Sequence, residues 1–573
     1  MQKGLAAVAL LAAGFLLYLP SDLSVSLTIP PDSSEYSIGL VNLLEHGRFG
    51  FTLNGLWYPS MYPPWFSVSC LIPAYLLSGG DALCLYWSVL LFALILLVLL
   101  YKIGRVLGLG GWALVPPVLV MLLPDFVFYS RVVMTEVPYV ALFAAGALLF
   151  LSFCIRKSIP CVYWLAAGML VTWSGMVRST GLPMLLPFAI LLVLKGGDLR
   201  FKIKAILLLF LPVIAYEVSN LAYNWFVFGS PLRSGYQFWL PVPYDYPSLL
   251  FNISYVSENI QVLIGERVIQ ATLCMLALLV VFSCIVLKGK LGGTGRNRRF
   301  LALFGYLLFQ LAVLSILYMG FHWVDSRFYL AITICLIPLF FYFLNEIVVR
   351  CIPRCRSFLL SGAGIACVVV FSNCPTRYGY LVGPRMWNFR ENMVAAEVLP
   401  SEAVVVKSGD PNVMDHFAFR ERKLTLFPLV REFDYVSRMV APASIRERHD
   451  PPSSWRQGVI EDLVKNGVCK LPFPFVFAES PGEVRHFLEK GKRVFLQEVI
   501  GNPNEKIEIA AIDQMLKRHG MRTKAFGSWT VPATKPNPIR HFYDIILLKG
   551  FSMDAWPEVT VAYYEIVLAE DEG

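Results

Sequence analysis

The feature that most constrains this chain is a series of long apolar runs between residues 4 and 373, separated by short loops that carry Lys and Arg. Across all 573 residues, 57% of the side chains are hydrophobic and 16% are charged, with a mean hydropathy of +0.60. Soluble domains are about 45–50% apolar and about 25% charged, so an ordinary soluble enzyme is excluded. Intrinsic disorder is excluded too, because so much apolar surface cannot stay in water. The sequence therefore predicts a protein of the lipid bilayer.

A membrane-spanning helix needs about 20 mostly apolar residues, and we count about 11 such runs. The expected spans are residues 4–20, 82–101, 112–124, 137–154, 161–177, 181–194, 205–226, 265–287, 300–319, 329–347 and 357–373, with a half-span at 65–77. The first run resembles a secretion signal, but no small-x-small cleavage site follows at the right place, so we expect it to stay as the first span. The predicted fold class is a polytopic α-helical membrane protein.

The loop charges predict the direction of the helices. With a cytoplasmic N-terminus, the inside loops contain the Lys- and Arg-rich stretches at 102–105, 156–157, 195–204, 288–299 and 350–356. Such an excess of cations is typical of cytoplasmic loops. An odd number of spans then places the C-terminus outside the cytoplasm. This topology accounts for the net charge of +9, so we expect no nucleic-acid partner.

The amino-acid composition changes after about residue 374, where the chain becomes charged and rich in turn-forming residues. We expect two domains, a membrane domain at 1–373 and an extracytoplasmic α/β domain at 374–573. The expected strands are 403–407, 473–477, 493–499, 542–548 and 559–567, with helices at 481–490 and 505–519. Cys374 and Cys469 could pair if their side of the membrane is oxidising, and the sequence leaves this open.

The first expected outside loop contains two carboxylates and a phenol at helical spacing. Asp32, Glu35 and Tyr36 stand at i, i+3 and i+4 behind Pro31, so they share one face if a helix begins there. They then form a candidate catalytic cluster just outside the bilayer. The alternative is a helix capping box, in which Asp32 is the N-cap and Glu35 reaches back to it.

Three more charged residues lie near membrane level in two other segments. Glu136 begins an apolar run and is preceded by Thr135, which is a plausible N-cap, so a purely structural role is the alternative. Arg131 lies in a short loop with little access to water. Arg178 interrupts an apolar stretch, and ionisable residues at such depth are costly and usually functional. The alternative for Arg178 is a side chain that extends to the surface.

A further outside turn, residues 321–329, places a His and an Arg among aromatic side chains. Arg327 could bind a phosphate by two parallel hydrogen bonds. His322 and Tyr329 are candidate substrate-binding residues beside it. The alternative is an aromatic belt at the membrane surface with one Asp–Arg pair.

These motifs resemble the GT-C superfamily of glycosyltransferases that use polyprenyl-phosphate sugars. The resemblance rests on residues 31–36 (PDSSEY), 43–47 (LLEHG), 57–59 (WYP), 62–64 (YPP), 130–136 (SRVVMTE) and 327–329 (RFY). It is strongest to the branch of protein O-mannosyltransferases and lipid A aminoarabinose transferases, and it covers residues 1–373. The Trp-Trp-Asp signature of oligosaccharyltransferases is absent.

The resemblance implies a multi-span catalytic domain that takes a lipid-linked sugar from the bilayer and transfers it to a hydroxyl acceptor on the extracytoplasmic face. Asp32 is the implied general base, Glu136 stands where many members have Asp, and Glu35 is the second acid of the first loop. Transfer releases a phosphate, for which Arg131, Arg178, Arg327 and His322 are the candidate partners, with Tyr36 and Tyr329 beside them. No cofactor is required by these residues, although some members use a divalent metal and this stays open.

Three other functions compete with this interpretation. A transporter would more often show a two-fold repeat with matched broken helices, which this sequence lacks. A polysaccharide polymerase or ligase is also multi-span, but it does not usually end in a large outside α/β domain. A mere membrane anchor leaves Arg178 and the charged turns unexplained.

Overall fold

The structure is a computed structural model of the whole chain. It describes residues 2–19, 31–53, 56–195, 197–232, 234–235, 254–287, 295–320, 324–351, 362, 394–395, 397–408, 425–429, 481–500, 509–533, 538, 541–542 and 558–569.

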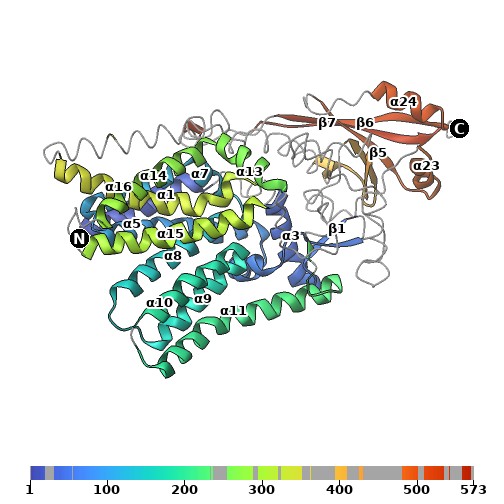
Figure 1. The fold of residues 1–573 in the computed structure, drawn as a ribbon. Coiled ribbons are helices and arrows are strands. Elements are labelled where there is room, and N and C mark those ends of the chain that lie inside the picture. Colours follow the sequence, from blue (N-terminus) through green and yellow to red (C-terminus); the bar gives the residue numbers. More distant parts are fainter. Residues whose placement is uncertain are drawn as a thin grey trace.

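The membrane domain is a bundle of long apolar helices (Figure 1). The longest are α1 (Gln2–Tyr18), α5 (Tyr86–Leu107), α8 (Glu136–Ile155), α9 (Cys161–Val177), α11 (Leu199–Phe228), α14 (Arg267–Leu287), α15 (Gly295–Met319) and α16 (Leu330–Cys351). In the described part of the chain, 6 helical stretches are long and apolar enough to cross a membrane. The chain is therefore a polytopic α-helical membrane protein, as the apolar runs predicted.

Shorter elements connect and complete the long helices. They are η1 (Ser67–Leu71), α4 (Ile72–Leu77), η2 (Ala82–Leu85), η3 (Gly110–Leu114), α6 (Val115–Met121), α7 (Pro124–Tyr129), η4 (Ser179–Met184), α10 (Leu185–Leu194), α13 (Ser254–Gly265) and η5 (Ser326–Tyr329). Five apolar stretches, including α1 and α9, have only 10–17 residues. The expected count of about 11 spans stays a prediction, because such lengths are marginal for a bilayer and residues 357–361 and 363–373 lie outside the described residues.

Close backbone contact holds α9 against α11. A Cβ built on Gly168 would lie 2.3 Å from the carbonyl oxygen of Leu209, so only glycine allows this approach. Small residues at helix contacts are typical of membrane bundles, where van der Waals packing replaces the hydrophobic effect between helices. The outward side of α11 stays apolar, with Trp225 and Phe226 at 59% and 83% exposure, as expected of a surface that faces lipid.

One end of the bundle carries the elements of the first expected outside loop. Helix α3 (Pro31–His46) begins with a proline, whose fixed backbone angle and missing N–H suit the first helical position. A two-stranded antiparallel ribbon follows, β1 (Gly50–Leu53) and β2 (Leu56–Pro59). Figure 1 shows α3 and β1 at the end of the bundle remote from the N-terminus. We call this end of the bundle the α3 end.

A mixed five-stranded sheet forms the C-terminal part of the chain. Its strands are β3 (Val404–Ser408), β4 (Thr425–Leu429), β5 (Val494–Ile500), β6 (Met521–Val531) and β7 (Val559–Leu568), in the order β4-β3-β5-β7-β6. The pairs β4–β3 and β3–β5 are parallel, and β5–β7 and β7–β6 are antiparallel. Helices α23 (Pro481–Glu489) and α24 (Ile509–Lys517) supply residues to the apolar core on one face of the sheet.

Several expected elements of this part match the structure. The runs at 403–407, 493–499 and 559–567 form β3, β5 and β7, and the two expected helices are α23 and α24. The predictions missed β4 and β6. The expected strand 473–477, nearly all of 542–548, Cys374 and Cys469, and the domain boundary at 373/374 lie outside the described residues. The extracytoplasmic location of this domain stays a prediction, although Figure 1 draws β5, β6 and β7 beyond the α3 end.

Candidate functional site

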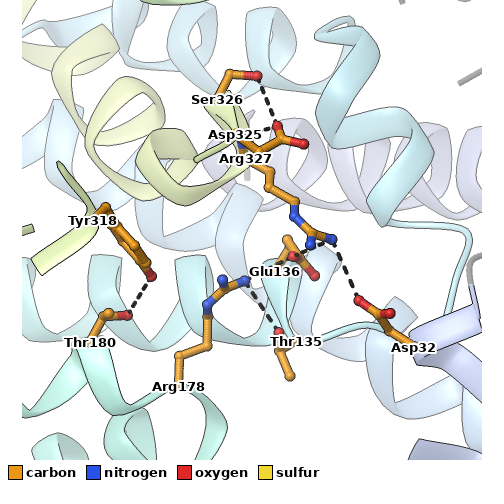
Figure 2. Close-up of polar contacts among 9 residues, drawn as sticks. All are labelled: Asp32, Thr135, Glu136, Arg178, Thr180, Tyr318, Asp325, Ser326 and Arg327. Carbon is orange, nitrogen blue, oxygen red and sulfur yellow. Dashed lines mark hydrogen bonds and ion pairs between the residues drawn. The ribbon is translucent and has the colours of Figure 1, made fainter. Parts of the chain in front are cut away.

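Four charged side chains from separate parts of the sequence meet at the α3 end (Figure 2). Asp32 comes from the first turn of α3, and Glu136 is the first residue of α8. Arg178 follows the last residue of α9, and Arg327 lies in the turn η5 that leads into α16. Each lies where a helix of the bundle begins or ends, and together we call them the charged cluster.

Glu136 and Arg178 form the tightest contact in this cluster. Arg178 Nη1 donates to Glu136 Oε1 at 2.8 Å and to Thr135 Oγ1 at 3.3 Å. The Glu136 side chain is 2% exposed, and that of Arg178 is 15% exposed. Thr135 stands at the N-cap position but makes no capping hydrogen bond, and its hydroxyl accepts from Arg178.

The second carboxylate oxygen of Glu136 is left available. Glu136 Oε2 is buried, and none of the described residues hydrogen-bonds to it. A buried carboxylate oxygen without a donor is costly, so natural proteins rarely leave one without a role.

Arg327 lies between the two carboxylates. Its Nη1 is 3.7 Å from Asp32 Oδ2 and 3.5 Å from Glu136 Oε1. Good N–H···O hydrogen bonds measure about 2.7–3.2 Å, so these are ion pairs at longer range. The backbone around Arg327 is fixed, because Asp325 Oδ1 accepts hydrogen bonds from Arg327 N and from Ser326 Oγ at 3.0 and 3.3 Å.

Aromatic side chains form one wall of the cluster. The Arg178 guanidinium lies over the rings of Tyr139 and Phe328, at 5.9 and 5.3 Å from the ring centroids. Phe328 also stacks on Tyr318 at 4.4 Å, and the Tyr318 hydroxyl donates to Thr180 Oγ1 at 3.3 Å. These contacts fix the guanidinium on one side, while its Nη1 bonds to Glu136.

Glu35 lies one helical turn after Asp32 but binds a different part of the chain. Its Oε2 accepts hydrogen bonds from Ser60 Oγ at 2.8 Å and from Met61 N at 3.1 Å. The capping-box alternative is therefore wrong for Glu35, because its carboxylate does not reach back to the helix start. Burial of the carboxyl raises the pKa of Glu35 to about 7, against the opposing effect of the Ser60 hydrogen bond and with a smaller upward effect of Asp32.

The two candidate tyrosines are both buried near the cluster. The Tyr36 ring packs against Tyr62 and Phe66 with centroid distances of 4.8 and 4.9 Å. Tyr329 directly precedes α16, two residues after Arg327, and its ring lies 6.1 Å from that of Tyr318. Contact of either tyrosine with a substrate stays a prediction.

Arg131 lies at a junction with α1, and its contact with a phosphate stays a prediction. The side chain is completely buried, and its Nε and Nη2 donate to the carbonyl oxygen of Leu17 at 3.2 and 2.7 Å. Leu17 lies in the last turn of α1, where a cation is favoured by the helix dipole. Tyr86 supports the same junction, since its hydroxyl donates to the carbonyl oxygens of Tyr18 and Ser130. Arg131 is therefore omitted from the proposed binding residues.

The expectations for His322 and for a divalent metal both stay open. His322 lies outside the described residues. Within the ranges that the structure covers, no three His, Cys, Asp or Glu side chains gather as metal ligands. Asp32 and Glu136 are the two carboxylates of the charged cluster, and both face Arg327.

Sequence reasoning missed the partners that hold the charged residues. Thr180 and Tyr318 were not recognised, because neither carries a charge that would single it out in an apolar run. Ser60 and Met61, the partners of Glu35, follow the WYP stretch of the first loop without any motif of their own. Thr135 was noted only as a cap.

Known proteins offer only distant likenesses. No protein-family model matches the chain, and no curated protein matches its sequence. A crystal structure of ArnT from Cupriavidus metallidurans bound to undecaprenyl phosphate is 10% identical, with a TM-score of 0.49 and coverage of 97% of each chain. The Archaeoglobus fulgidus oligosaccharyltransferase in complex with Zn and sulfate is 11% identical, with a TM-score of 0.42 over 80% of this chain and 66% of that chain.

The same archaeal oligosaccharyltransferase, AglB, in complex with an inhibitory peptide and a dolichol-phosphate is 10% identical, with a TM-score of 0.39 over 80% of this chain and 69% of that chain. ArnT and AglB are GT-C superfamily members, which is the superfamily that the motifs of this chain resemble. At these TM-scores and identities the likeness assigns no residue and no substrate to this chain.

Proposed function

We propose that this protein is a membrane glycosyltransferase that moves a sugar from a polyprenyl-phosphate donor to a hydroxyl acceptor on the extracytoplasmic face. The observation that carries the proposal is the position of Arg327, whose Nη1 lies within 4 Å of both Asp32 and Glu136 at the end of an apolar bundle. A cation held between two carboxylates suits a reaction in which one group takes a proton while another stabilises a departing phosphate.

Asp32 is the proposed general base. It lies in the first turn of α3 and its side chain is 21% exposed, so an acceptor can reach it. In the proposed step, Asp32 takes the proton of the acceptor hydroxyl as that oxygen bonds to the anomeric carbon of the sugar. The bond from that carbon to the phosphate oxygen breaks at the same time, so a single displacement inverts the anomeric centre.

Arg327 is the proposed partner of the leaving phosphate. Charge develops on the phosphate oxygen as the sugar departs, and a guanidinium offers a fixed fork of N–H donors to such an oxyanion. The contacts of Arg327 with the carboxylates, at 3.5 and 3.7 Å, are longer than a good hydrogen bond, so a phosphate can compete for the guanidinium.

Glu136 and Arg178 are proposed to hold the sugar and fix the cluster. Arg178 binds one carboxylate oxygen of Glu136, and the other, Oε2, is buried without a donor among the described residues. A sugar hydroxyl supplies such a donor. Arg178 in turn is fixed by Phe328 and Tyr139, so the pair acts as a rigid wall next to Arg327.

The decisive experiment compares cells that contain the protein with cells that lack it. Mass spectrometry of envelope lipids and glycans should reveal a product that carries one additional sugar only when the protein is present. Asp32→Asn keeps the shape of the side chain but removes the base, so it should abolish that product while the protein level stays normal. A product level equal to wild type in the Asp32→Asn variant contradicts the role of Asp32.

The orientation of the α3 end can be tested separately. A cysteine placed at the exposed position Arg48, just after α3, should react with a membrane-impermeant maleimide in intact cells. Lys157 is exposed just after the C-terminal end of α8, which is the end remote from Glu136. A cysteine placed there should react only after the membrane is opened. The reverse labelling pattern puts the charged cluster in the cytoplasm and overturns the extracytoplasmic assignment.

A further inference from the structure

Glu35 holds a short part of the first loop against the helix that carries Asp32. We call residues 60–62 the 60–62 segment. Glu35 Oε2 accepts from Ser60 Oγ and Met61 N, and Ser60 Oγ in turn accepts from Tyr62 N at 3.1 Å. The Tyr62 ring packs on Tyr36, the residue after Glu35. Every residue of the 60–62 segment is therefore tied to α3 within one turn of Asp32.

Gly235, which follows α11, meets the same segment. A Cβ built on Gly235 would lie 2.2 Å from the carbonyl oxygen of Ser60 and 2.6 Å from that of Met61. Real Cβ atoms do not approach backbone oxygens so closely, so Gly235 is needed for this contact. Gly235 is buried there, although it lies far along the chain from Ser60.

The position of the segment relates it to the acceptor. Asp32 and Glu35 stand at i and i+3 of α3, so their side chains are neighbours on one helix face. Arg327 lies on the side of Asp32 that is directed toward α8 and α16. An acceptor whose hydroxyl reaches Asp32 must extend away from the charged cluster. Among the described residues, the 60–62 segment is the next surface that such an acceptor meets along α3.

We propose that Glu35 is a positioning residue, which fixes the 60–62 segment and the Gly235 contact as the surface that directs the acceptor hydroxyl to Asp32. This inference rests on the proposed function and assigns Glu35 a role through hydrogen bonds in place of proton transfer. Both bonds end on the single oxygen Oε2, so an amide oxygen can replace it. Glutamine is thus a matched substitution that keeps the bonds and removes the charge.

The test uses the full chain with two measurements for each variant. The first is the amount of the sugar-bearing product in cells, relative to wild type and to Asp32→Asn, at matched protein level. The second is the affinity of the purified protein for undecaprenyl phosphate, which probes the donor side alone. The variants are Glu35→Ala, Glu35→Gln and Gly235→Ala. Gly265→Ala is the control, because a Cβ at Gly265 meets nothing within 4 Å.

Glu35→Ala removes the hydrogen bonds to Ser60 and Met61, and Gly235→Ala places a Cβ against their carbonyl oxygens. Each change should reduce product about tenfold, while the Kd for undecaprenyl phosphate changes less than about twofold. Glu35→Gln should restore most of the product, and Gly265→Ala should match wild type. If Glu35→Gln loses as much product as Glu35→Ala, Glu35 acts through its charge and the proposal is wrong.

Two further results also overturn the proposal. Full product from Glu35→Ala means that the tie to the 60–62 segment is dispensable. Equal losses of product and of undecaprenyl phosphate affinity mean that Glu35 supports the whole site and has no separate link to the acceptor. Failure of the proposed function is recognised independently, because Asp32→Asn then gives the same product as wild type.

Discussion

Arg178 Nη1 lies 2.8 Å from Glu136 Oε1, although 42 residues separate the two positions in the chain. The contact joins the end of α9 to the start of α8, and both side chains are shielded from water. A buried ion pair adds little net stability compared with apolar residues, but it is costly to break on one side. The pair therefore fixes the geometry of the site more than it stabilises the bundle.

This pair can be tested by a double-mutant cycle. Glu136→Gln alone leaves the Arg178 guanidinium without its carboxylate, and Arg178→Met alone leaves Glu136 with only the longer contact to Arg327. Breaking a buried pair in this way costs about 3–5 kcal/mol. We expect each single variant to lower the midpoint of thermal unfolding in detergent strongly, and the double variant to lose less than the sum of the two. Additive losses contradict a direct coupling between these side chains.

Arg327 should determine the affinity for the donor phosphate. Removing a guanidinium that makes one charge-assisted hydrogen bond costs about 1.5–3 kcal/mol, so Arg327→Ala should weaken undecaprenyl phosphate binding about 10- to 100-fold. Titration of the purified protein with undecaprenyl phosphate, followed by tryptophan fluorescence, measures this. Arg48→Ala is the control, since Arg48 is exposed beyond the end of α3. Equal affinities of wild type and Arg327→Ala remove Arg327 from the phosphate site.

The titration of Glu35 predicts a dependence of stability on pH. Burial raises the pKa of Glu35 from 4.5 to about 7, so the folded protein favours the protonated carboxyl. Its contribution to stability is then present in full below the ordinary pKa and is lost as the pH rises through about 7. Thermal unfolding between pH 5 and 8 should show this loss in wild type and a flatter profile in Glu35→Gln. Identical profiles of the two proteins contradict the raised pKa.

The α9–α11 contact should tolerate no side chain at Gly168. A Cβ there would lie 2.3 Å from a backbone oxygen of α11, so Gly168→Ala must push the helices apart. Overpacking of this kind costs about 1–3 kcal/mol. The melting temperature in detergent should therefore fall for Gly168→Ala but not for Gly305→Ala, whose Cβ meets nothing within 4 Å. Equal melting temperatures indicate that α9 and α11 can separate without cost.

The sequence was sufficient to find the helices of the bundle and the turns that carry the charged cluster. Apolar runs identify helices because each residue contributes independently to burial in lipid. The same reasoning found β7, which is apolar, but missed β6, whose residues from Lys524 to Phe526 are exposed. It also missed β4, in which Pro428 argues against a strand.

The partners of the charged residues were harder to predict. A charge at membrane depth shows that some partner exists, but the partner can be a carboxylate, a phosphate or a backbone carbonyl. Arg178 pairs with Glu136, whereas Arg131 binds the carbonyl of Leu17. These contacts depend on how distant helices pack, and spacing along one chain carries no such information.

The bond from Arg131 to Leu17 spans 114 positions and has a consequence for how the protein is made. During synthesis the first helix leaves the ribosome long before residue 131 exists. Until then its last carbonyl groups must be satisfied by water or by lipid headgroups at the membrane surface. Helix α1 therefore gains its bond to Arg131 only after α5 and the segment around residue 131 have been inserted.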